Sequence, residues 1–240
     1  MKKTLLLAFA MMIVATGAYA QKKTTANNKR IPASVAINDD GTRNDNSAKV
    51  LATIELPPAD MGLEMPFREV LKNRCTQRNI LPEELPIEMV SSLLWSAYGF
   101  NRPEESKRVA PSAVNAQEYD VYLFNHEGIF LYNAEKNSLE MVAKGDHVKD
   151  ISEQKFFQEA PIALVLVANY DRMEMFKDKE VRDFYAAVDC GYISQNIYLF
   201  CASAKLSTVA CGGINRDKLA KLIGIKNGKA MLAHPVGLSK

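Results

Sequence analysis

Seven consecutive apolar residues, Ile162 to Ala168, restrict the folds open to this chain. The run has the length of a strand, and a strand that is apolar at every position is covered on both faces. We therefore expect it at the centre of a sheet. A segment without proline follows, from Lys179 to Leu206, in which apolar and small residues recur at three- and four-residue steps. This spacing predicts a long central helix. Its small residues should let a neighbour approach closely; they are Ala187, Gly191 and Ser194.

The other elements follow from composition and from turn residues. A strand is expected at 50–56, ended by Pro57-Pro58. A helix from Pro66 to Asn79 would include the 74–78 segment, and a second helix should begin at Pro86 and end at Gly99. The remaining prediction is a three-stranded meander at 119–124, 129–132 and 139–142, then a turn at 211–213, a helix at 216–223 and a last strand near 231–236.

The first twenty residues have the order of a secretory signal peptide: Lys2 and Lys3, an apolar run, then Ala18-Tyr19-Ala20. The apolar run is shorter than a membrane span, and no second run of that length follows. Residues 21–47 are polar and predict a disordered linker, so the folded domain would cover 48–240. We expect an exported protein, with the periplasm as its compartment. The two lysines of the signal account for the formal net charge of +2. The balanced remainder indicates no nucleic-acid partner.

The four cysteines are Cys75, Cys190, Cys201 and Cys211. They form no C-x-x-C pair, which argues against a zinc site. Because Cys190 and Cys201 lie about three helical turns apart, they cannot bridge, and we expect four free thiols, mostly buried. The histidines are interpreted as surface or structural residues, and no Ser/His/Asp order stands out.

Arg74-Cys75-Thr76-Gln77-Arg78 places two cations and a hydroxyl within five residues, and guanidinium groups suit phosphate and carbonyl oxygens. Alone, the segment would be better explained as a solvated helix end. Further segments accompany it in a fixed order: Leu93 to Gly99, Arg108 to Ala113, a hairpin from Gly128 to Leu139, Gly191 to Leu199, Leu206 to Gly213, and His234 to Gly237.

Together these segments resemble the nitroreductase family, most closely its branch of SagB-type dehydrogenases, which has the same extra hairpin after the Pro-Ser segment. The resemblance covers 66–237. It implies an α+β fold with a central, mostly antiparallel sheet flanked by helices, and an obligate homodimer with FMN at the interface. FMN would transfer hydride from a reduced donor, with NAD(P)H as one candidate, to a small organic acceptor.

The resemblance also implies roles for individual residues. Arg74 and Thr76 correspond to phosphate and ribityl ligands, and Arg78 to the cation facing the N1 and C2 carbonyl edge of the flavin. The segment with Pro111, Ser112, Ala113 and Asn115 resembles the one that holds the flavin from the partner subunit. The turn at Ala210, Cys211, Gly212 and Gly213 resembles the wall near N5, where glycine permits close approach and leaves an amide free.

The chain departs from the family pattern at four places. Cys75 replaces a basic residue, Thr76 replaces the usual serine, and Gly212 stands where many members have Glu. Lys240 is the only cation after the last strand that could reach the phosphate. These departures motivate an alternative, a flavin-binding or scaffold protein that kept the fold without turnover. A third hypothesis, an azoline-oxidising dehydrogenase of peptide modification, is disfavoured by export.

Overall fold

The computed structural model describes residues 49–60, 62 and 65–240. The predicted signal peptide and linker lie outside this part of the chain. The described residues form a seven-stranded sheet and a separate two-stranded one. The large sheet has the order β1-β6-β5-β4-β7-β9-β8, and each neighbouring pair is antiparallel. Its strands are β1 (Ala52–Glu55), β4 (Tyr119–Phe124), β5 (Gly128–Asn133), β6 (Ser138–Lys144), β7 (Ile162–Asn169), β8 (Leu206–Thr208) and β9 (Gly228–Leu238).

The apolar run forms β7, an interior strand paired with β4 on one side and β9 on the other. Every residue of β7 except Asn169 is buried. Because side chains alternate across a strand, Leu164 and Leu166 join one hydrophobic cluster while Val165 and Val167 join another on the opposite face. The prediction of a strand covered on both faces is confirmed.

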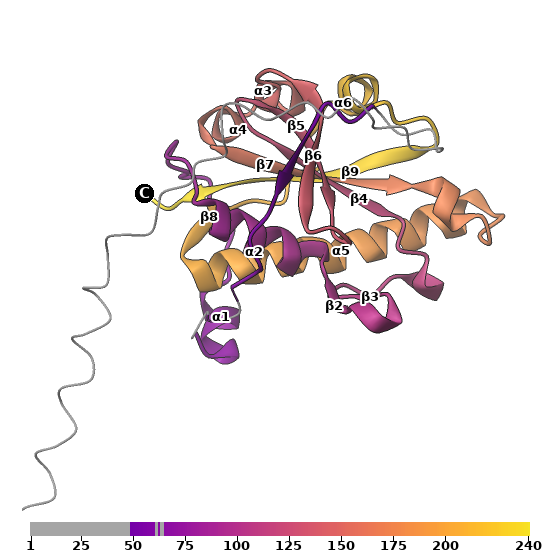
Figure 1. The fold of residues 1–240 in the computed structure, drawn as a ribbon, viewed down its shortest axis with the longest axis horizontal. Helices are drawn as coiled ribbons and strands as arrows, with labels where there is room; N and C mark the ends of the chain where they lie inside the picture. The colour runs from indigo at the N-terminus through magenta and orange to yellow at the C-terminus, as the bar shows by residue number, and fades with distance from the viewer. Residues whose placement is uncertain (1–48, 61, 63–64) are drawn as a thin grey trace, which may run out of the picture.

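Helices cover the two faces of the sheet (Figure 1). On one side lie α1 (Phe67–Asn73), α2 (Ile87–Tyr98) and α5 (Lys179–Ala204); on the other lie α3 (Val148–Ile151), α4 (Lys155–Glu159) and α6 (Arg216–Ile223). The predicted helices at 87–98, 179–204 and 216–223 are confirmed. Helix α5 runs beneath the sheet for 26 residues, capped by the Asp178 side chain, which accepts from the Val181 amide.

The short elements complete the frame. The two-stranded sheet joins β2 (Phe100–Arg102) and β3 (Lys107–Arg108), and three 3₁₀ turns are η1 (Pro103–Glu105), η2 (Ala113–Asn115) and η3 (Tyr170–Met173). The β5–β6 hairpin, predicted from the 128–139 pattern, extends the sheet toward β1.

One local prediction was wrong. Helix α1 ends at Asn73, so the 74–78 segment is not helical, since the Gln77 amide instead donates to the Thr208 carbonyl of β8 at 2.9 Å. The small residue Ser194 does have a close neighbour, because it is buried and its hydroxyl lies 2.8 Å from a ring nitrogen of His234 on β9. Of the four cysteines, all free thiols, Cys75 is exposed and the other three are buried.

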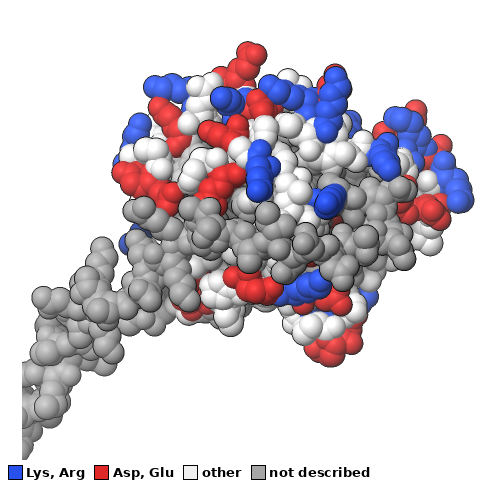
Figure 2. Space-filling view, turned by 45° about the horizontal axis from the view of Figure 1, so that its top comes forward, with Lys and Arg blue, Asp and Glu red and all other residues white. Residues whose placement is uncertain are grey.

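Figure 2 shows lysine and arginine interspersed with aspartate and glutamate on the face that carries α3, α4 and α6. A surface of mixed sign is what a nearly neutral chain predicts. Among the described residues, no helix is both long enough and apolar enough to cross a bilayer.

Candidate functional site

Tyr198, in the second half of α5, joins two of the segments singled out in the sequence. Its hydroxyl lies 3.0 Å from the Thr76 hydroxyl and accepts a 2.8 Å hydrogen bond from the Ala210 amide. The 74–78 segment and the turn at 210–213 are therefore side by side although more than a hundred residues separate them. The sequence analysis included Tyr198 in the segment from Gly191 to Leu199 but gave it no role of its own, so its position at this junction was missed.

Two guanidinium groups flank this junction. The Arg74 Cζ lies 5.4 Å from the centroid of the Tyr198 ring, and the Arg78 Cζ lies 5.9 Å from that of Phe156 on α4. Within the described part of the chain, neither arginine makes a salt bridge. Contacts with aromatic rings orient a guanidinium without neutralising it. The pair thus presents uncompensated positive charge beside Thr76 and the exposed Cys75.

The turn at 210–213 is fixed by β9 and by the loop before α4. The Cys211 amide donates to the Ala233 carbonyl at 2.8 Å, and the Ser152 hydroxyl donates to the Gly213 carbonyl at 2.9 Å. Gly212 and Gly213 are both exposed, and neither amide donates to another described residue. The Ala210 amide is not free, because it donates to the Tyr198 hydroxyl. The free amides expected in this turn are therefore those of the two glycines.

Behind the junction lies a buried polar network centred on His234. One ring nitrogen is 2.8 Å from the Ser194 hydroxyl and the other is 3.2 Å from the Thr208 hydroxyl. The imidazole meets the Tyr198 ring edge to face, with centroids 5.3 Å apart. Complete burial lowers the pKa of His234 to about 3. It is a neutral structural support for Tyr198 rather than a solvent-facing base.

The Pro111–Asn115 segment is held elsewhere along α5. The Ala113 amide donates to the Asp189 carboxylate at 2.7 Å. Asp189 and Tyr198 are nine residues apart, or about 13 Å of helix, and point to opposite sides of it. One chain therefore does not bring Ser112, Ala113 or Asn115 to the Arg74 cluster. Lys240 is exposed, and its amide lies 3.4 Å from the Asn79 carbonyl.

The loop at 112–117 is backed by two buried carboxyl groups. Glu118 has no exposed surface, and by geometry its carboxyl oxygens have no hydrogen-bond partner among the described residues, although the carboxyl of Asp189 is a close neighbour. Burial, and then the neighbouring Asp189, raise the pKa of Glu118 to about 7. The loop itself has positive φ at Val114 and Asn115, 51° and 58°, a region that non-glycine residues seldom occupy. The sequence analysis missed the pair of Glu118 and Asp189. The signal for it was Asp189, a carboxylate that stands between Val188 and Cys190 in the helix.

Comparison with known proteins places this architecture. A model of the nitroreductase family matches residues 71–238. The chain belongs to the nitroreductase family. A nitroreductase-family protein is an oxidoreductase, and the α+β fold expected from the sequence is confirmed.

Individual relatives agree with this assignment. One relative is a protein of Methanocaldococcus jannaschii whose name describes it as a nitroreductase. It is 27% identical over 195 residues, which cover 77% of this chain and 95% of the relative. A solved nitroreductase structure from Ralstonia eutropha JMP134 is 30% identical, with a TM-score of 0.73 over 84% of this chain and 98% of that one. A chain of an Escherichia coli microcin synthetase complex shares the fold at 17% identity, with a TM-score of 0.60 over 77% of this chain and 76% of that one.

Proposed function

We propose that this nitroreductase-family oxidoreductase uses FMN to transfer electrons from a reduced donor to a small organic acceptor. The observation that carries the proposal is the pair of unpaired guanidinium groups of Arg74 and Arg78, close to the free amides of Gly212 and Gly213. The guanidinium groups suit a phosphate, and the free amides suit a ring that accepts hydrogen bonds at its edge. When bound, FMN would supply hydride transfer, which no amino-acid side chain performs.

The residues of the cluster fit such a group. Arg74 and Thr76 would hold the phosphate and ribityl chain, with Cys75 beside them, while Arg78 would stabilise negative charge at the N1 edge. The glycine turn, with Ala210 and Cys211, would form the wall near N5. Lys240 is a further candidate phosphate ligand. Tyr198 holds Thr76 and Ala210 in place through its hydroxyl.

The proposal includes a homodimer. Helix α5 exposes apolar side chains, with Val181 at 44%, Phe184 at 62% and Tyr192 at 47% exposure, and α1 adds Phe67 at 67%. Exposed apolar side chains gathered on α5 and on α1, which packs against it, indicate a surface that another molecule covers. A second copy would supply the Pro111, Ser112, Ala113 and Asn115 segment to the flavin of its partner, since these residues lie far from the Arg74 cluster of their own chain.

We further place the chain in the SagB-type branch and outside the cytoplasm. The β5–β6 hairpin supports the first proposal, and the sequence of residues 1–20 supports the second. An exported enzyme is separated from cytoplasmic NAD(P)H, so a donor other than nicotinamide is compatible with the proposal. The acceptor is proposed only as a small organic molecule.

Arg78→Ala tests the flavin assignment. The protein without residues 1–20, supplied with excess FMN and gel-filtered, should show a flavin absorption spectrum, and Arg78→Ala should lower FMN affinity or its reduction rate by roughly tenfold, the loss of one charge-assisted contact. Arg68→Ala, an exposed arginine on α1, is the matched control. A colourless wild type would refute FMN binding. Bound FMN that no reductant can reduce would favour the scaffold alternative.

A further inference from the structure

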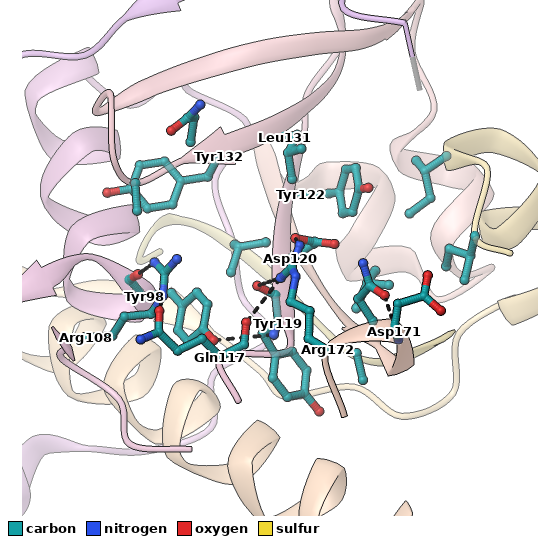
Figure 3. A pocket seen from close by; sticks show the side chains of 18 of the residues that line it. Tyr98, Arg108, Gln117, Tyr119, Asp120, Tyr122, Leu131, Tyr132, Asp171 and Arg172 are labelled. Carbon is teal, nitrogen blue, oxygen red and sulfur yellow. Dashed lines mark hydrogen bonds and ion pairs between the residues drawn. The ribbon is translucent and has the colours of Figure 1, made fainter. Parts of the chain in front are cut away.

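Strands β4 and β5 separate at one end and leave a cavity between them. They pair only from Tyr122 opposite Leu131 to Phe124 opposite Ile129, whereas β4 pairs with β7 from Tyr119 onward. The cavity at this split has a volume of about 970 Å³ and is lined from β4, the β5–β6 hairpin, η3 and the turn after α6 (Figure 3). None of the residues assigned to the flavin lines it, so the inference does not rest on the proposed function.

Arg172 occupies the edge of β4 that β5 leaves open. One of its Nη groups lies 3.2 Å from the Gln117 carbonyl and 3.3 Å from the Tyr119 carbonyl, and the other donates to the Asp120 carboxylate at 2.6 Å. The Glu118 carbonyl between them accepts from Asn169 instead. The guanidinium thus replaces the missing strand, and its charge is neutralised by Asp120. The split is stabilised open and is not a frayed end.

Arg108 is a second cation in this cavity, without such a partner. Its Nε donates to the Gln117 amide oxygen at 2.8 Å and its Nη1 to the Tyr98 carbonyl at 2.7 Å. Its Cζ lies 4.3 Å from the Tyr98 ring centroid and 4.1 Å from that of Phe100. In the described part of the chain it makes no salt bridge. Arginine keeps its charge when buried, and Asp120, which attracts Arg108, is already paired with Arg172. Arg108 is therefore suited to bind an anionic ligand.

Tyr132 supplies an unused polar atom in the same cavity. The residue is 7% exposed and lines the cavity, and its buried hydroxyl has no hydrogen-bond partner among the described residues. A buried hydroxyl without a partner is costly unless a ligand or water satisfies it. Figure 3 shows Tyr132 and Arg108 on the same side of the cavity, with Tyr122 and Leu131 along the wall.

We propose that this cavity binds a small organic carboxylate with a flat apolar body. The carboxylate would neutralise Arg108 and accept from the Tyr132 hydroxyl, and the body would pack on the aromatic and aliphatic walls formed by Phe100, Tyr122 and Leu131.

Calorimetric titration with benzoate tests the proposal on the whole mature chain, with and without FMN. Benzoate should bind, while benzamide, of the same shape without charge, and acetate, with charge but no ring, should bind at least roughly tenfold more weakly. Tyr132→Phe keeps the ring and should weaken benzoate binding by at least about tenfold, as expected for one hydrogen bond to a charged carboxylate. Arg108→Gln should weaken it by at least about tenfold.

Lys221→Gln removes one exposed positive charge on α6 and should leave benzoate binding unchanged. If Arg108→Gln fails to fold, Tyr132→Phe still tests the proposal, because it removes a single oxygen atom that has no hydrogen-bond partner among the described residues. No heat with benzoate, equal binding of benzamide, or unaltered affinity in Tyr132→Phe would overturn the proposal. None of these outcomes depends on flavin binding elsewhere in the molecule.

Discussion

At the scale of single residues, Glu118 and His234 impose opposite pH dependences on the free energy of unfolding. Burial, and then Asp189, raise the pKa of Glu118 from 4.5 to about 7, so the folded chain keeps a proton that the unfolded chain releases. This contribution is present below pH 4.5 and is lost as the pH rises to about 7. Burial lowers the pKa of His234 from 6.5 to about 3, so its contribution is present above pH 6.5 and is lost as the pH falls.

Between pH 4.5 and 6.5 the contributions of Glu118 and His234 to the slope of the free energy of unfolding against pH should nearly cancel. Glu118→Gln removes the contribution that falls as the pH rises. Relative to wild type, the free energy of unfolding should then rise by up to about 1.4 kcal/mol per pH unit, the value for one proton. His234→Gln should give a slope of opposite sign. Urea unfolding at several pH values measures both. Glu135→Gln, the same kind of change at an exposed hairpin residue, is the control for the substitution itself. If the free energies of unfolding of both buried variants depended on pH as that of wild type does, the assignment would be contradicted.

At the scale of elements, the Tyr198 hydroxyl joins α5 to the 74–78 segment and to the glycine turn. Tyr198→Phe keeps the ring contacts with Arg74 and His234 but removes both hydrogen bonds. We expect FMN affinity to fall by roughly three- to tenfold, because Thr76 and the turn are no longer fixed before binding. Fluorescence titration of FMN measures this. Tyr132→Phe, the same change at a hydroxyl without a hydrogen-bond partner among the described residues, is the control, and equal affinities in the two variants would remove the positioning role of Tyr198.

The elements that sequence predicted well are those set by local periodicity. The apolar run of β7 and the spacing in α2 and α5 each carry their own pattern over many residues, so tertiary contacts reinforce them. The 74–78 segment was assigned wrongly because its backbone partner, Thr208, lies far away in sequence. For the same reason the sequence named Arg74 and Thr76 but not Tyr198 or Glu118. Residues that are distant in sequence and meet in the fold produce no periodic pattern in the sequence. The cavity at the β4–β5 split is equally hidden, because it depends on the point where the pairing of the two strands stops.

At the scale of the whole molecule, no contact within one chain explains why residue 191 is a glycine. It lies in the middle of the 26-residue helix α5, where glycine costs roughly 0.5–1 kcal/mol relative to alanine. A Cβ at this position would meet no heavy atom within 4 Å. The residue is exposed, on a helix that also exposes Phe184 and Tyr192. A close approach by a second copy would account for a residue that the single chain does not require.

Gly191→Leu distinguishes the two situations. In a monomer the change should be harmless or mildly stabilising, because the position is open and leucine is the better helix former. In a dimer whose helices meet at Gly191, the added side chain should weaken self-association by at least about tenfold, seen by analytical ultracentrifugation over a concentration series, and FMN should be lost with it. Lys221→Leu places the same side chain on exposed α6 and should leave association unchanged. A dimer that tolerates Gly191→Leu would place the subunit contact elsewhere, and a wild type that stays monomeric at all concentrations would exclude a shared flavin site.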